Sequence, residues 1–161
     1  MPIAVGSRVP DTTFKVMTKD GPADMKSTDL FGGKTVALFA VPGAFTPTCH
    51  AKHVPSFLAN LDALKAKGVD TVACTAVNDV FVMNEWSKAT GAQDKILFLA
   101  DGGAAFAKAV GLDVDLTAGG LGVRSRRYAM LVKDGVVKAL NIEEAPGKLE
   151  KSSAEELLKS L

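Results

Sequence analysis

The stretch Thr35–His53 reads TVALFAVPGAFTPTCHAKH and indicates a strand followed by a helix. Its beginning, Thr35–Val41, is an apolar run of strand length, which is typical of a strand covered on both faces of a sheet. A Pro-Gly turn follows, and Pro47 suits the first position of a helix. The stretch therefore predicts a buried strand and, a few residues later, a helix that carries Cys49 in its first turn.

That helix is predicted over Thr48–Lys67. Apolar residues recur in it at helical spacing, namely at Val54, Phe57, Leu58, Leu61 and Leu64. Gly68 suits the end of the helix. Pro55 lies inside it and should kink it, because proline has no N–H to donate and its ring clashes with the preceding turn.

Strands and helices alternate along the rest of the chain. Further strands are predicted at Phe14–Thr18, Val69–Val77, Ile96–Ala100, Tyr128–Val132 and Val136–Ile142, with turns at Lys19–Pro22 and Lys133–Gly135. Further helices are predicted from their capping residues. Ser27 or Thr28 would cap a short helix that ends at Gly32–Gly33, Asn78 or Asp79 one that runs to about Thr90, and Asp101 one that ends at Gly111. A capping box at Ser152–Glu155 would start the last helix.

This order of elements predicts one domain over residues 1–161, of the α/β class. We expect a central mixed β-sheet flanked by helices, because the strands alternate with helices and then end in a hairpin. The first strand and its turn add an N-terminal β-hairpin extension. A thioredoxin-like fold fits this order, although other small α/β folds fit it as well.

The composition excludes several classes of protein. The 161 residues include 19 basic and 18 acidic ones, and a net charge of +1 does not suit a nucleic-acid binder that relies on bulk positive charge. Two cysteines, Cys49 and Cys74, are too few for a disulfide scaffold or a Cys-rich metal site. No apolar run approaches the ~20 residues of a bilayer span, and the opening MPIAVGSRVP lacks the pattern of a signal peptide. We therefore expect a cytoplasmic protein without nucleic-acid or membrane partners.

Cys49 lies where the end of a helix favours an anion, and the thiolate is the reactive form of a cysteine. An ordinary thiol has a pKa of about 8.5, and lowering such a value to roughly 6 takes about 3.4 kcal/mol. The end of a helix supplies roughly 0.3–1 kcal/mol, or about 2 kcal/mol when it is sheltered from water. The helix alone is therefore insufficient, and a nearby cation is required.

An arginine is the expected cation, because at about 4 Å a positive charge contributes on the order of 4 kcal/mol at an effective dielectric constant of about 20. Arg124, Arg126 and Arg127 all precede the predicted strand at Tyr128. Arg127 is adjacent to that strand and is best placed, whereas alternation sends Arg126 to the opposite face. The hydroxyl of Thr46, three residues before the thiol, would lie over the same spot.

These residues carry a resemblance to a known family. The spacing Pro42-x-x-x-Thr46-x-x-Cys49 resembles the active-site motif of the peroxiredoxins. The strings PGAFTPTC and GLGVRSRRYAMLVKDG, the second of which ends at Gly135, are similar to the type II subfamily, which includes the mammalian peroxiredoxin-five group. The similarity runs over nearly the whole chain, from VGSRVPDTTF to SSAEELLKSL.

The resemblance implies a thiol peroxidase that reduces hydrogen peroxide and alkyl hydroperoxides without a metal, flavin or other cofactor. By position, Cys49 would be the peroxidatic cysteine. Thr46 and the Cys49 backbone N–H would hold the peroxide oxygens, and Arg127 would stabilise the thiolate and the charge that moves along the O–O bond. Pro42 would shield the site and limit further oxidation.

The resemblance also implies how Cys49 is recycled from its sulfenic acid. The resolving cysteine that the mammalian branch carries near its C-terminus is absent, so glutathione with glutaredoxin, or thioredoxin, is the expected reductant. Cys74 lies in an apolar run, where it is either a small buried hydrophobe or a second redox cysteine. Members of the subfamily commonly form homodimers, and the same is expected here.

Two other functions stay open at this point. One is a non-enzymatic thioredoxin-like module, acting as a redox sensor or holdase with a sheltered thiol. The other is a Cys-dependent acyl hydrolase, which needs a histidine base. His53 shares the helix face of Cys49 and His50 does not, but we expect a surface or structural role for both. We also expect Met83 and Trp86 in the core or an interface and a flexible turn at Gly119–Gly122.

Overall fold

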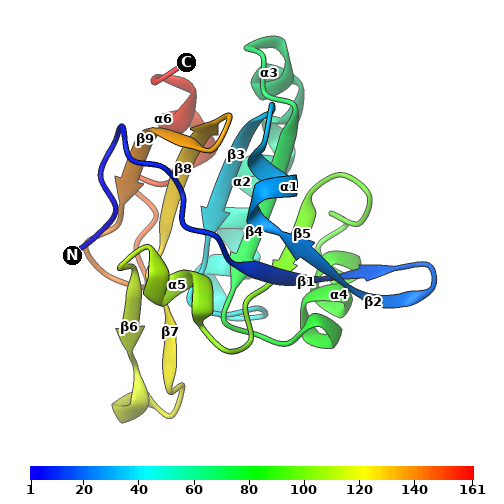
Figure 1. Cartoon of the computed structure of the whole chain (residues 1–161). Helices are drawn as coiled ribbons and strands as arrows, with labels where there is room; N and C mark the ends of the chain where they lie inside the picture. The colour runs from blue at the N-terminus through cyan, green and yellow to red at the C-terminus, as the bar shows by residue number, and fades with distance from the viewer.

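A seven-stranded sheet forms the centre of the molecule, in the strand order β2-β1-β5-β4-β3-β8-β9. The structure is a computed structural model that describes residues 1–161 (Figure 1). The strands of this sheet are β1 (Thr13–Thr18), β2 (Gly21–Lys26), β3 (Thr35–Ala40), β4 (Thr71–Ala76), β5 (Leu97–Ala100), β8 (Tyr128–Lys133) and β9 (Val136–Ile142). A separate two-stranded ribbon consists of β6 (Asp113–Asp115) and β7 (Val123–Ser125).

Short helices lie on both faces of the sheet (Figure 1). They are α1 (Ser27–Phe31), the π-helix η1 (Cys49–His53), α2 (Val54–Ala59), α3 (Leu61–Ala66), α4 (Val80–Ala89), α5 (Ala105–Ala109), the 3-10 helix η2 (Thr117–Gly119) and α6 (Ala154–Leu158). None of these helices is long and apolar enough to cross a membrane.

The sheet is mixed, as the sequence predicts. β3 pairs in parallel with β4 and antiparallel with β8, and β4 pairs in parallel with β5. The hairpin β1–β2 extends the sheet through the antiparallel bridge between Lys15 and Ala100. The α/β class, the thioredoxin-like architecture and the N-terminal hairpin extension are therefore confirmed.

The apolar run of β3 does not alternate with polar residues, and the position of the strand explains why. Its side chains are buried on both faces of the sheet. Ala37 and Phe39 belong to the core under α2, α3, α4 and α6, whereas Val36 and Leu38 belong to the core under α1 and α5. A strand between two apolar layers has no solvent face, and hence no reason to alternate.

The predicted helix Thr48–Lys67 is divided into segments. Helical structure begins at Pro47, widens to the π-helix η1, continues as α2 and breaks at Asn60 before α3. Pro55 has no N–H to donate to the hydrogen bonds of a regular α-helix, and the π-helix η1 lies just before it in the chain. At the break, the Asn60 side-chain amide donates to the Ser56 carbonyl at 2.8 Å and so competes with the backbone.

Two of the predicted caps are wrong. Neither Ser27 nor Thr28 caps α1, whose N-cap position is Lys26 and has no side-chain hydrogen bond. The Ser27 hydroxyl instead donates to the Pro10 carbonyl and accepts from the Thr12 N–H. The cap of α6 is Ser153, which accepts from the Glu156 N–H at 3.2 Å, and not the box that starts at Ser152.

Two acidic residues do serve their helices as predicted. Asp79 caps α4 by accepting from the Val82 N–H at 2.9 Å. Asp101 precedes α5 by several residues, yet its carboxylate accepts from the N–H groups of Phe106 and Ala107 at 3.0 and 2.9 Å. Both helices end just before a glycine with positive φ, Gly91 and Gly111.

The ribbon β6–β7 is not predicted by the sequence, because three-residue strands are too short to show a period. It projects away from the main sheet (Figure 1), and the turn predicted at Gly119–Gly122 lies at its tip. The predicted turn at Lys19–Pro22 is shorter than expected, since Gly21 and Pro22 already belong to β2. Pro22 is tolerated there because β2 is an edge strand.

Candidate active site

Cys49 and Arg127 lie next to each other because of the sheet topology. β3 ends at Ala40 and β8 begins at Tyr128, and these two residues are paired across the antiparallel strands. The segment that follows β3 therefore meets the residue that precedes β8 at one edge of the sheet. Two residues 78 positions apart in the sequence are brought into contact in this way.

The sulfur of Cys49 has two polar neighbours. The Thr46 hydroxyl lies 2.8 Å from Sγ, and the Arg127 guanidinium donates to Sγ from its second terminal nitrogen at 2.9 Å. The same hydroxyl lies 2.7 Å from the Gly43 carbonyl oxygen. Because a hydroxyl has one proton, it donates to a thiolate when the sulfur is charged and to the carbonyl when it is a thiol.

The Arg127 side chain is held on three sides. Its Nε donates to the Pro146 carbonyl at 2.9 Å, one terminal nitrogen contacts His53 Nδ1 at 2.9 Å, and the other reaches the sulfur. Only 2% of Arg127 is exposed. None of the ion pairs in the structure includes it, so this buried guanidinium has no carboxylate partner.

His53 is a neutral side chain that supports Arg127. Burial, and then the positive charge of Arg127, lower the pKa of His53 from an ordinary 6.5 to about 3, against a smaller opposing effect of the Ser152 carbonyl. Since Nδ1 accepts from the guanidinium, the proton is on Nε2, which donates to the Ser152 carbonyl at 2.9 Å. Both ring nitrogens are occupied, so His53 is not placed to act as the base of a hydrolase.

The other predicted residues lie around this centre without touching the sulfur. His50 accepts from the Trp86 indole N–H at 3.0 Å and stacks on Phe45. Arg124 donates to the carbonyls of Leu121 and Pro42 at 2.8 and 3.2 Å. Arg126 donates to the Glu143 carbonyl at 3.4 Å. Pro42 is buried, and its carbonyl is held by the Arg124 side chain.

Cys74 is a fully buried thiol on β4. Burial raises the pKa of Cys74 well above its usual range, and Cys49 adds to this effect while Arg127 opposes it. Both cysteines are free thiols in the structure. Its place in the apolar core fits the interpretation of Cys74 as a small hydrophobe. Met83 and Trp86 are likewise core residues.

Most of the centre is buried. Cys49 and His53 are 0% exposed. Of the two polar neighbours of the sulfur, Arg127 is buried and Thr46 is partly exposed. No three His, Cys, Asp or Glu side chains are grouped as ligands for a metal ion. The chemistry that the residues themselves can perform is nucleophilic attack by a sheltered sulfur beside a fixed cation.

The chain is similar to known proteins over nearly its whole length. The family model described as Redoxin matches residues 4–158. The chain is 48% identical over 164 residues to "Peroxiredoxin-2E, chloroplastic" of Arabidopsis thaliana, covering 99% of the chain and 69% of that relative. It is 46% identical over 161 residues to "Peroxiredoxin-2B" of the same plant, covering 99% of both. A crystal structure of reduced Prx3 in complex with H2O2 from Vibrio vulnificus matches with a TM-score of 0.93 and 51% identity, covering 98% of each chain.

The buried imidazole predicts how stability changes in acid. His53 has a pKa of about 3 in the folded protein and about 6.5 when exposed, so between these values the unfolded chain binds more protons. The free energy of unfolding should therefore fall as the pH is lowered from 6.5 towards 3, by up to about 1.4 kcal/mol per pH unit from this residue. Urea denaturation at several pH values measures the slope.

His53→Gln should remove this part of the slope, because glutamine does not titrate. His50→Gln is the matched control: it keeps His53 and should retain the slope of the wild type. An unchanged slope in the His53→Gln protein would contradict the assignment of His53 as a neutral buried group.

Proposed function

The chain belongs to the redoxin family and is a type II peroxiredoxin, a thiol peroxidase of cell redox homeostasis, and we propose that Cys49 is the cysteine that reacts with peroxide. The observation that carries this assignment is the buried Arg127 guanidinium, whose only contact able to carry a negative charge is the Cys49 sulfur. A buried cation needs an anion, and a thiolate supplies it. The comparisons do not favour the alternative of a non-enzymatic module.

The proposed reaction is attack by the Cys49 thiolate on the terminal oxygen of a hydroperoxide. An S–O bond forms and the O–O bond breaks, so the sulfur is oxidised to a sulfenic acid and the peroxide is reduced. The leaving oxygen takes a proton and departs as water from hydrogen peroxide or as an alcohol from an alkyl hydroperoxide. Negative charge moves from sulfur to the leaving oxygen, and Arg127 faces that path throughout.

Thr46 and the backbone N–H of Cys49 are the proposed peroxide-binding groups. The hydroxyl already lies 2.8 Å from the sulfur, and a residue in the first turn of a helix has an N–H that the helix leaves without an acceptor. A peroxide would enter beside Thr46, because this residue is partly exposed. Pro42, buried and fixed by Arg124, would keep that entrance narrow and limit further oxidation.

An external thiol is the proposed reductant of the sulfenic acid, supplied by glutathione with glutaredoxin or by thioredoxin. Cys74 is the only other cysteine in the chain, and its buried thiol, with a raised pKa, offers little thiolate for attack on the oxidised sulfur. A cycle that needs such reductants suits a reducing compartment, and we place the protein in the cytoplasm on this ground.

A homodimer is the proposed assembly. Phe45 and Phe81 are large apolar side chains that are 52% and 62% exposed. Phe45 stacks on His50, which is bonded to Trp86 of α4, the helix that also carries Phe81. Large apolar side chains that are exposed to this extent are suited to contact with a second copy of the chain.

The roles of Cys49 and Arg127 predict the first oxidation step. Reduced wild-type protein should consume hydrogen peroxide stoichiometrically before any recycling partner is added, and Cys49→Ser should not. Arg127→Ala should slow the step by about a hundredfold or more, because it removes the cation beside the reacting sulfur. Arg126→Ala, which removes an adjacent arginine away from the sulfur, should stay close to the wild type. Peroxide consumption in a stopped-flow instrument measures these rates, and a fast Arg127→Ala protein would refute the assignment.

Resolution by an external thiol predicts that Cys74 is dispensable. Cys74→Ala should keep both the first oxidation and steady-state turnover with glutathione and glutaredoxin, or with thioredoxin, since the core position tolerates a small apolar side chain. Turnover is measured by coupling to the oxidation of NADPH. A variant that is oxidised normally but no longer turns over would show that Cys74 resolves the sulfenic acid.

The proposed assembly predicts a change of mass on substitution of Phe81. The wild type should sediment as a dimer and Phe81→Glu as a monomer, because a charge would be buried in the interface. Val5→Glu alters a side chain that is similarly exposed elsewhere and should leave the dimer intact. Analytical ultracentrifugation distinguishes these cases, and a monomeric wild type would exclude the homodimer.

A further inference from the structure

The loop between β9 and α6, residues 143–153, supplies backbone acceptors to the active site. The Pro146 carbonyl accepts from Arg127 Nε and the Ser152 carbonyl from His53 Nε2, both at 2.9 Å. The Gly147 carbonyl accepts from the Thr48 hydroxyl at 2.9 Å. The position of the guanidinium therefore depends on a segment that has no helix or strand of its own.

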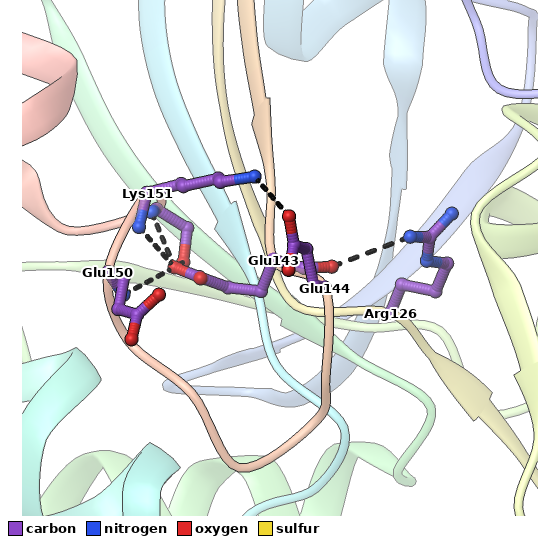
Figure 2. A network of polar contacts seen from close by, with 6 residues as sticks. Arg126, Glu143, Glu144, Glu150 and Lys151 are labelled. Atoms are coloured by element: carbon purple, nitrogen blue, oxygen red, sulfur yellow. Dashed lines mark hydrogen bonds and ion pairs between the residues drawn. The ribbon is translucent and has the colours of Figure 1, made fainter.

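One carboxylate holds this loop together. A single oxygen of Glu143, Oε2, accepts from the N–H groups of Glu150, Lys151 and Ser152 at 2.9, 2.7 and 2.7 Å, and from the Ser152 hydroxyl at 2.7 Å. Figure 2 shows the loop curving back so that these donors converge on Glu143. Three successive N–H groups around one oxygen form an anion-binding nest.

The nest and the Ser152 hydroxyl are the partners of this carboxylate. Glu143 is 3% exposed and takes part in none of the ion pairs. The Lys151 ammonium instead pairs with Glu144 at 2.9 Å, and Arg126 donates to the backbone carbonyl of Glu143 (Figure 2). This buried anion has no cation beside it and is stabilised by the three N–H groups and the Ser152 hydroxyl, so the fold of the loop and the charge of Glu143 depend on each other.

Glu143 carries this charge at neutral pH. Burial raises its pKa, but the hydrogen bonds from Ser152, Lys151 and Glu150 outweigh burial and leave the pKa of Glu143 below its usual range. The backbone of Glu143 also anchors the loop beside the site, because its N–H donates to the Arg127 carbonyl at 3.0 Å.

We propose that Glu143 is a positioning residue for the peroxidase reaction: its carboxylate folds the 143–153 loop so that the Pro146 and Ser152 carbonyls hold Arg127 and His53 against Cys49. Only one residue separates Glu143 from His53, since Ser152 donates to Glu143 through its N–H and accepts from His53 through its carbonyl. This inference rests on the proposed roles of Cys49 and Arg127. Glu143 touches neither the sulfur nor a peroxide, and it acts through the loop.

Glu143→Gln tests the proposal, because glutamine keeps the size of the side chain and removes its charge. The rate constant of the first oxidation by hydrogen peroxide, measured in a single turnover on folded protein, should fall by about tenfold to a hundredfold as Arg127 loses its fixed position. Glu144→Gln is the matched control: the adjacent glutamate pairs only with the Lys151 side chain and should leave the rate unchanged. A Glu143→Gln protein that is less stable yet reacts at the wild-type rate would overturn the proposal.

A double-mutant cycle identifies the route of the effect. If Glu143 acts through Arg127, Glu143→Gln should slow the wild type but should not slow Arg127→Ala any further. An equal slowing in both backgrounds would overturn the proposal, because it would show a route independent of Arg127.

Ser152→Ala keeps the test decisive if Glu143→Gln does not fold. It removes one of the four donors to Glu143 Oε2, and the rate constant should fall by about threefold or more. An unchanged rate in the folded Ser152→Ala protein would overturn the proposal. Failure of the proposed function can be told apart from failure of this inference, because it needs no variant of the loop. In that case Cys49→Ser would still consume peroxide, or Arg127→Ala would react at the wild-type rate.

Discussion

A positive charge sealed inside the protein without a carboxylate is the constraint on which the site depends. Moving a guanidinium out of water costs several kcal/mol, and neutral acceptors recover only part of this. Arg127 has two such neutral acceptors, the Pro146 carbonyl and His53, and its third contact is the Cys49 sulfur. In the proposed reaction the thiolate of that sulfur is the anion that the guanidinium lacks, so the reacting atom and the buried charge share one contact.

The sheet gives this contact its precision. Cys49 lies on the segment that follows the inner strand β3, and Arg127 directly precedes the neighbouring strand β8; nearly all side chains of both strands are buried. The groups that hold Arg127 and His53 from the other side do not belong to the sheet. Pro146 and Ser152 belong to an irregular loop, whose N–H groups bond to the buried carboxylate of Glu143 where those of a strand would bond to a neighbouring strand. The site thus combines a rigid sheet edge with a loop closed around an anion.

The sequence predicted the inner part of this arrangement and not the outer part. Apolar runs identify β3 and β8, and the spacing of Thr46, Cys49 and the arginines follows from the position of a helix start and a strand start. The role of His53 could not be predicted, because its partner atom is the backbone carbonyl of Ser152, 99 residues away. Glu143 was missed for the same reason, since its donors are N–H groups that every residue carries. Backbone acceptors and donors leave no signal in residue types.

The complete burial of the Cys49 sulfur has a consequence for the catalytic cycle. A hydroperoxide is small enough to reach a sheltered atom past one partly exposed hydroxyl, but the thiol of a protein reductant is attached to a surface that is not. Under the proposed function, the conformation described above therefore suits the oxidation step, and reduction by the thiol of a protein requires the sulfur to become exposed.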